Sequence, residues 1–241
     1  MALTLKPASA TRLARQARSA AARPDRKQAI LLAAEKLFAQ HGYHAVSIRQ
    51  IADEAAVPLA LVAYYYGQKH ELFHAIFEHW NQTIEERLSA LQAVSHDPQD
   101  PETLPRIIEA FTLPVIKLRA SPEGEYYALL VARELYNAPL EADRVLRDYF
   151  DPMAHAFIEA LQAALPHATR GQVAWCYQFG LGALLHHLRD FRIERLSLGE
   201  SRPFDPAAAS LLVTFIAGGI RAALPAPASG PLPAKNESLT G

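Results

Sequence analysis

Apolar side chains recur every three or four residues along most of the chain, the spacing that places them on one face of an α-helix. No segment shows the strict alternation of apolar and polar residues that a half-buried strand requires. Pro114 and Pro152 are expected to kink or break the helices that contain them. The sequence therefore predicts an all-α fold, with helices over residues 24–41, 48–55, 58–65, 69–94, 104–118, 121–137, 140–165, 169–189 and 205–224.

Two of these helices are short and follow each other closely. Ser47 with Gln50 three positions later forms a capping-box pattern, which starts a helix at Ile48. A turn at Ala56 separates it from a second helix that opens at Pro58, a residue suited to the first turn of a helix. A helix, a short turn and a second short helix form the geometry that places the second helix in the major groove of DNA.

The region 30–72 resembles the DNA-binding domain of the TetR family of transcriptional regulators. Two turn positions depart from the family pattern, because Ala56 stands where glycine is usual and Pro58 where a capping Ser or Thr is usual. The second helix also begins with apolar residues, which favour contacts with thymine methyl groups and readout of DNA shape. The resemblance rests on Phe38, Gly42, Tyr43, Ser47, Ile51, Ala52, Ala55, Val57, the run 64–69, Glu71 and Leu72.

This resemblance implies a DNA-binding role for seven residues. Arg49 is expected to reach a guanine edge, and Tyr64 and Lys69 are expected to contact phosphates. Lys69 is also placed at the positive end of the long helix that begins there. Tyr66 is expected to pack in the core instead. The full predicted set is Arg49, Gln50, Leu59, Ala60, Tyr64, Tyr65 and Lys69.

The run 70–74 is also an H-E-x-x-H pattern, the spacing with which two histidines on one helix face bind zinc. The longer form of this motif fails, because Phe77 and Trp80 stand where glycine and histidine are needed. A third ligand has to come from His79, His96 or Asp97. A zinc hydrolase that uses His70, Glu71 and His74 therefore stays as an alternative, while we expect no metal, no cofactor and no enzymatic activity.

The net charge of −1 hides an asymmetry, because residues 1–79 carry +4 and the rest of the chain carries −5. A positive end that coincides with the predicted DNA-binding motif is the electrostatic footprint of a protein that faces phosphates. A second alternative is a helical scaffold whose basic arm binds nucleic acid without sequence preference. The single cysteine, Cys176, rules out an internal disulfide and favours a cytoplasmic location. No run of 18 apolar residues lacks charges, so we expect no membrane span.

Four regions are predicted along the chain. They are a disordered basic arm (1–23), a helix-turn-helix DNA-binding domain (24–73), a larger helical effector-binding and dimerisation domain (74–224) and a disordered tail (225–241). The predicted helix 69–94 crosses the boundary between the two domains and can act as a lever. Helices 169–189 and 205–224 are almost free of charges, so they need burial on more than one side. The resemblance implies that they form a homodimer interface, and the alternative is that they are core helices of a monomer.

The resemblance also implies a small-molecule effector pocket between residues 100 and 190. Pockets of this kind have apolar walls and a few polar anchors. The predicted function is a ligand-responsive transcriptional regulator, a repressor that binds a palindromic operator as a dimer and is released by the effector. The predicted pocket residues are Phe111, Tyr127, Arg133, Phe157, Trp175 and Phe179.

Overall fold

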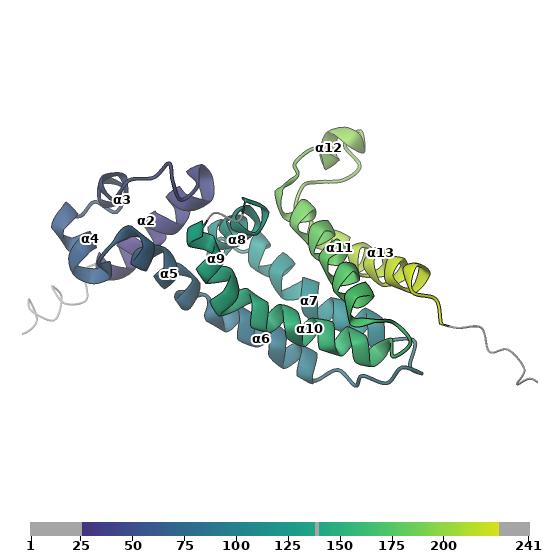
Figure 1. Cartoon of the computed structure of the whole chain (residues 1–241). Coiled ribbons are helices and arrows are strands. Elements are labelled where there is room, and N and C mark those ends of the chain that lie inside the picture. The colour runs from purple at the N-terminus through teal and green to yellow at the C-terminus, as the bar shows by residue number, and fades with distance from the viewer. Residues whose placement is uncertain (1–25, 138–139, 227–241) are drawn as a thin grey trace, which may run out of the picture.

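The computed structural model describes residues 26–137 and 140–226 of the chain, and the predicted arm and most of the predicted tail lie outside them. The described residues are helical and contain no strand, which confirms the all-α prediction (Figure 1). The α-helices are α2 (Arg26–His41), α3 (Ile48–Glu54), α4 (Leu59–Tyr66), α5 (Lys69–His79), α6 (Asn81–Gln92), α7 (Thr103–Ala120), α8 (Glu125–Asn137), α9 (Leu140–Val145), α10 (Asp151–Ala164), α11 (Arg170–Arg189), α12 (Ile193–Leu196) and α13 (Ala209–Ala223).

Helices α2 to α5 form a small N-terminal unit, here called the head, around a core that includes Phe38, Ile51, Val62 and Phe73. The capping box of α3 forms as predicted. The Gln50 amide donates to Ser47 Oγ at 3.3 Å, and the Ser47 amide donates to Gln50 Oε1 at 2.8 Å. Helix α4 begins one residue later than predicted, because Pro58 has extended backbone angles and serves as its N-cap.

The predicted helix 69–94 is two helices, α5 and α6, which meet at Trp80. The backbone of Trp80 leaves the helical region at φ −96° and ψ 7°, and the Thr83 hydroxyl donates to its carbonyl at 2.8 Å. The Trp80 side chain donates from Nε1 to Glu35 Oε2 at 2.7 Å and stacks on the Tyr127 ring at 5.1 Å between centroids. These contacts with α2 and α8 favour the break, which the apolar periodicity of the segment did not indicate.

The remaining helices, α6 to α13, form the body. Helix α7 packs on α6, α8 and α13, and α8 also packs along α2 of the head (Figure 1). The chain stays helical through Pro152. A π-helical segment, Leu146–Phe150, leads directly into α10, and Pro152 lies in the first turn of that helix. Helix α8 begins at Glu125, later than predicted, since Ser121 ends α7 and its hydroxyl accepts a hydrogen bond from the Gly124 amide. The short helix α12 was not predicted.

The turn between α3 and α4 contains Ala56 at φ 51°, a left-handed conformation that costs a residue with a Cβ atom about 1 kcal/mol relative to glycine.

We predict that Ala56→Gly stabilises the protein by about 0.5–1 kcal/mol, because glycine adopts this conformation without strain. The matched control is Ala55→Gly at the preceding residue, which has an ordinary φ of −75° and is expected to lose stability. Urea unfolding of the full-length protein measures both. A loss of stability in both variants would contradict the assignment of strain to Ala56.

Candidate nucleic-acid interface and effector region

Helix α4 presents most of its side chains to solvent, at the end of the head that lies away from the body (Figure 1). Tyr64 is 78% exposed, Leu59 46% and Tyr65 36%. The rings of Tyr64 and Tyr65 contact each other edge to face at 5.1 Å between centroids. Ala60 is exposed too, so the surface of α4 consists mainly of apolar groups and two phenols.

Arg49 and Gln50 are both exposed in α3, which packs on α4. Tyr66, in contrast, is half-buried, and its hydroxyl donates to the Lys27 carbonyl of α2 at 2.8 Å. Tyr66 therefore packs within the head, as the sequence suggested, while Tyr64 and Tyr65 remain on its surface.

Lys69 lies in the first turn of α5 and is half-buried. Its ammonium group sits over the Tyr43 ring, 4.3 Å from the ring centroid, and 5.9 Å from the Phe38 centroid. The same helix start carries a capping box, in which the Gln68 amide donates to Glu71 Oε2 at 2.6 Å. Lys69 thus places a positive charge next to the N-terminus of α5, where the helix dipole also favours anions.

The H-E-x-x-H segment contributes to this helix start. Glu71 is the capping carboxylate, His70 is exposed and His74 is half-buried with its ring 6.5 Å from that of Tyr149. Burial is the main cause that lowers the pKa of His74. Within residues 26–137 and 140–226, no group of three or more His, Cys, Asp or Glu side chains is placed to hold a metal ion. The Glu71 carboxylate instead accepts the hydrogen bond from the Gln68 amide at the start of its own helix.

The head contacts the body through two polar connections. Glu35 of α2 is 2% exposed and accepts the hydrogen bond from Trp80. Burial raises the pKa of the Glu35 carboxyl to about 7, although hydrogen bonds from the Trp80 side chain and the Tyr127 backbone lower it. Arg133 of α8 donates to the carbonyls of Gln40 and His41 at the end of α2, at 3.3 and 3.1 Å.

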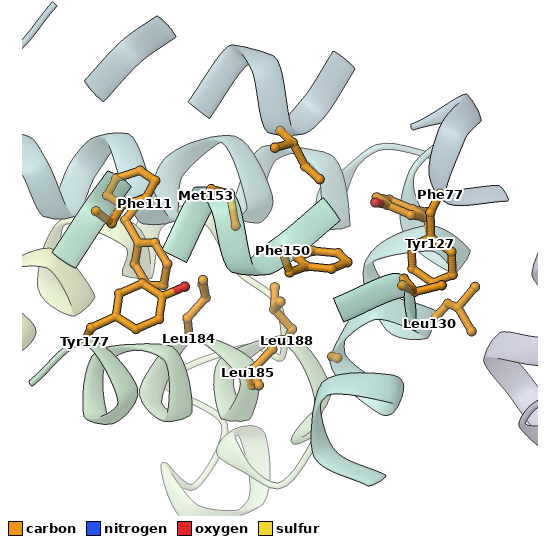
Figure 2. Close-up of a cluster of buried hydrophobic side chains, with 14 of the residues drawn as sticks. Phe77, Phe111, Tyr127, Leu130, Phe150, Met153, Tyr177, Leu184, Leu185 and Leu188 are labelled. Carbon is orange, nitrogen blue, oxygen red and sulfur yellow. The ribbon is translucent and has the colours of Figure 1, made fainter. Parts of the chain in front are cut away.

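The six residues proposed for an effector pocket do not share one cavity within the described chain. Phe111 and Phe157 are buried with their rings 5.3 Å apart, and Arg133 is committed to the head. Tyr127 is also buried, but Figure 2 shows it at the opposite end of the apolar cluster from Phe111. The other two, Trp175 and Phe179, lie on the surface of α11.

Sequence reasoning missed Arg87, which is 6% exposed in the middle of the body. Its guanidinium lies 4.9 Å from the centroid of the Phe111 ring and 5.8 Å from that of Phe157. A signal was present, since Arg87 is spaced three and four residues from Ile84 and Leu91, the buried apolar residues of α6. An arginine at a core-facing position indicates a function or a partner.

An open groove of about 870 Å³ lies on the body and is lined by residues of α6, α7 and the loop between them. A small cavity of about 30 Å³ lies beside it and is lined by Arg87 and Tyr127. The groove and the cavity share the residues Thr83, Pro114 and Leu118. The small cavity is thus adjacent to the groove, and the buried arginine is one of its lining residues.

Helices α11 and α13 pack on each other and on α7, but each leaves one aromatic face in solvent. Trp175 and Phe179 of α11 are 64% and 67% exposed, and Leu211 and Phe215 of α13 are 72% and 70% exposed. By length and composition alone, Pro206–Ala223 is apolar enough to cross a membrane, with a mean hydropathy of 1.4. Helices that pack against protein in soluble proteins pass the same test.

Comparison with known proteins identifies related regulators for both the head and the body of the chain. A family model described as bacterial regulatory proteins of the tetR family matches residues 30–76, and a model of the tetracyclin repressor-like C-terminal domain matches residues 109–219. The HTH-type transcriptional regulator HbdR of Aromatoleum sp. (strain CIB) is 32% identical over 94 residues, which are 39% of this chain and 34% of that protein. The chain thus aligns with about a third of this relative's length.

Two solved structures show the same fold. The fatty acid degradation regulator FadR from Bacillus halodurans superposes with a TM-score of 0.57 at 17% identity, over 83% of this chain and 98% of that one. A TetR-like transcriptional regulator from Rhodococcus sp. RHA1 gives a TM-score of 0.51 at 24% identity, over 83% and 96% of the two chains. The arrangement of head and body is therefore common to these proteins.

The raised pKa of Glu35 predicts a pH-dependent stability. Because the folded state holds this proton up to about pH 7 while the unfolded chain releases it near 4.5, stability falls as the pH rises through this window. Above the window the cost of the buried charge is constant. We predict that Glu35→Gln, whose amide oxygen still accepts from Trp80, gains stability over the wild type from pH 5 to 7 and keeps the gain above it, about 1–3 kcal/mol.

Thermal unfolding between pH 5 and 8 measures this difference. Glu78→Gln, which changes an exposed carboxylate of α5, is the control and is expected to follow the wild-type pH dependence. A Glu35→Gln curve parallel to that of the wild type at every pH would show that Glu35 is ionised at low pH in the folded protein.

Proposed function

The chain belongs to the tetR family of bacterial transcriptional regulators, and from this premise we propose that it is a ligand-responsive repressor that binds a palindromic operator as a homodimer. The observation that carries the proposal is the pairing of a helix-turn-helix head with an uncovered aromatic face on α11 and α13. Two-fold symmetry in a dimer demands two equivalent half-sites on the DNA.

The proposed DNA contacts use the exposed surface of α3 and α4. Arg49 takes the guanine edge, and the side chains of Leu59 and Ala60 meet thymine methyl groups in the major groove. The exposed Tyr64 and the ammonium of Lys69, at the start of α5, bind phosphates on either side of the recognition helix. Gln50 and Tyr65 complete the surface. The capping box of Gln50 engages its side-chain oxygen, so its amide nitrogen is the group offered to DNA.

The proposed dimer forms through α11 and α13, which pair with the same helices of a second copy in a four-helix arrangement. Four large apolar side chains, each more than 60% exposed, support this choice, because burying each of them stabilises a dimer by about 1.5–3 kcal/mol. Gly182, Gly218 and Gly219 have open space where a Cβ atom would stand, so a partner helix can approach closely. In this proposal the apolar face of α13 packs on a second copy and not in a membrane. We accordingly place the protein in the cytoplasm as a soluble dimer.

The effector is proposed to act on the relation between head and body. The head is joined to the body by the Trp80 break, by Glu35 and by Arg133. A small molecule that binds the body and favours one arrangement of these contacts shifts the population away from the one that fits DNA. A non-specific nucleic-acid scaffold would lack this response and would not distinguish the operator from random duplex.

We predict different consequences for two basic residues of the head. Arg49→Ala is expected to cost about 1–3 kcal/mol on the operator and to relax base preference at one position of each half-site. Lys69→Ala is expected to weaken binding to operator and random duplex by similar factors and to reduce the salt dependence. Fluorescence anisotropy with DNA upstream of the gene, at two salt concentrations and with random competitor, measures both.

Tyr66→Phe is the control, since the Tyr66 hydroxyl is engaged by the Lys27 carbonyl inside the head. Identical effects of Arg49→Ala and Lys69→Ala on all sequences would remove Arg49 from base recognition. Loss of all preference by the wild-type protein would favour the scaffold.

We predict that Phe215→Glu converts the protein to a monomer at micromolar concentration, because a dimer would have to bury the new charge without a partner. Sedimentation velocity measures the change. Leu198→Glu, at a 92% exposed residue in the connection before α13, is the matched control and is expected to remain dimeric. An unchanged dimer in Phe215→Glu together with a monomeric Leu198→Glu would move the interface to that connection.

A further inference from the structure

Arg87 carries a positive charge in the core of the body, and no acidic side chain that the structure describes neutralises it. It is 6% exposed, and no carboxylate of residues 26–135 and 143–226 forms an ion pair with it. Its Nε atom is buried without a hydrogen-bond partner. A buried charge that lacks a partner is costly, so a folded protein keeps one where something else binds it.

The surroundings of Arg87 stabilise the charge only in part. The rings of Phe111 and Phe157 lie close to the guanidinium, and a cation–π contact of this kind is favourable but does not satisfy its hydrogen-bond donors. Burial lowers the pKa of Arg87 to about 10, which still leaves it protonated at neutral pH. The side chain is therefore a buried, charged and partly unsatisfied hydrogen-bond donor.

A second polar group lies in the same cavity. Tyr127 is 2% exposed, and its hydroxyl is buried without a hydrogen-bond partner. Burial raises the pKa of Tyr127, and the nearby Thr83 side chain lowers it. Burial also raises the pKa of Tyr177, and the nearby Arg87 guanidinium lowers it. Figure 2 shows Tyr127 and Tyr177 at the two ends of the apolar cluster, with both hydroxyls directed inward. The cavity thus offers an unsatisfied guanidinium nitrogen and an unsatisfied phenol.

The space around these donors fits a small anionic head with an apolar body. The cavity at Arg87 and Tyr127 measures about 30 Å³, enough for a group of a few atoms by the measure in which one water needs about 10–15 Å³. The larger groove between α6 and α7 lies next to it, and Thr83, Pro114 and Leu118 line both. A guanidinium matches the planar geometry of a carboxylate, and the cavity is too small for a larger anion.

We propose that Arg87 binds the carboxylate of the effector, with a second hydrogen bond from Tyr127 Oη, while the apolar body of the effector lies in the groove between α6 and α7. The effector class is a small monocarboxylate with an apolar chain or ring. The regulatory consequence of this site rests on the proposed function, but the binding itself does not.

The site is linked to the head by direct contacts. The Tyr127 ring stacks on Trp80, and Trp80 donates to Glu35 of α2. A carboxylate that takes the Tyr127 hydroxyl acts on the residue at which α5 and α6 separate. Binding at Arg87 thereby favours one arrangement of Trp80 against Tyr127 and Glu35. A ligand shifts the orientation of the head only if it favours one such arrangement.

Isothermal titration of the full-length protein, without DNA, tests the site with four probes. The probes are octanoate, phenylacetate and the neutral amide of each. We expect at least one acid to bind saturably and its amide to bind about tenfold more weakly or worse, because a charge-assisted hydrogen bond is lost. Arg87→Met is expected to weaken binding of the acid by at least about tenfold and Tyr127→Phe by a smaller factor.

Arg147→Gln is the matched control. Arg147 lines neither the groove nor the cavity, and it is exposed and paired with Asp143 at 2.6 Å, so its loss is expected to leave acid binding unchanged. Trp80 fluorescence gives a second readout, since its ring stacks on Tyr127. If Arg87→Met does not fold, the comparison of acid with amide and the Tyr127→Phe variant decide the question.

Thermal unfolding separates a binding role from a structural one. We expect Arg87→Met to unfold at the same or a higher temperature than the wild type, because it removes an uncompensated buried charge. Equal binding of acid and amide, unchanged acid binding in Arg87→Met, or no saturable binding of any probe at about 1 mM would overturn the proposal. Failure of the operator-binding assay alone would instead count against the proposed function.

Discussion

The contact of Trp80 with Glu35 and Tyr127 is the interaction on which the arrangement of head and body depends. It joins α2, the junction of α5 and α6, and α8 in one buried cluster. The indole N–H binds Glu35 of the head, and the ring face stacks on Tyr127 of the body. A displacement of either residue therefore alters the contact with the other. Because the carboxyl of Glu35 is buried with a raised pKa, this contact also carries an energetic cost that the fold tolerates.

Two features leave the single chain incomplete. One is the aromatic face of α11 and α13, where Trp175 and Phe179 stack on each other in solvent. The other is Arg87, a cation in the core without an acidic partner among the described residues. Apolar groups in water and charges in a dry interior are both unfavourable. We propose a second copy of the chain as the partner for the first feature and a carboxylate ligand for the second, two separate binding events with opposite chemistry.

Helix α4 and the turn before it combine two features of the backbone with an apolar surface. Ala56 holds a left-handed turn that glycine would adopt without strain, and Pro58 begins α4 without a side-chain cap. The exposed surface of α4 then offers aliphatic groups and phenols rather than amides or guanidinium groups. In the proposed complex with DNA, this surface distinguishes bases through methyl contacts and groove shape, and Arg49 of α3 and the phosphate contacts carry much of the polar recognition.

The sequence by itself determined the local elements of this protein. The capping box at Ser47 and Gln50, the glycine stop after α2 at Gly42 and the periodicity of α11 and α13 follow from interactions between residues a few positions apart. The same local reasoning located the helix-turn-helix and its exposed tyrosines. It also placed helix 69–94 as one piece, since nothing within that segment opposes a continuous helix.

Only the tertiary structure decided what each apolar face meets. Periodicity shows that Phe111, Trp175 and Phe179 lie on apolar faces, but it does not say whether a face packs on its own chain or remains outside. Phe111 went into the core, whereas Trp175 and Phe179 stayed on the surface. The break at Trp80, the contact of Arg133 with the end of α2 and the burial of Arg87 likewise depend on partners far along the chain. Interactions between distant residues set these outcomes, and they arise only when the helices have packed.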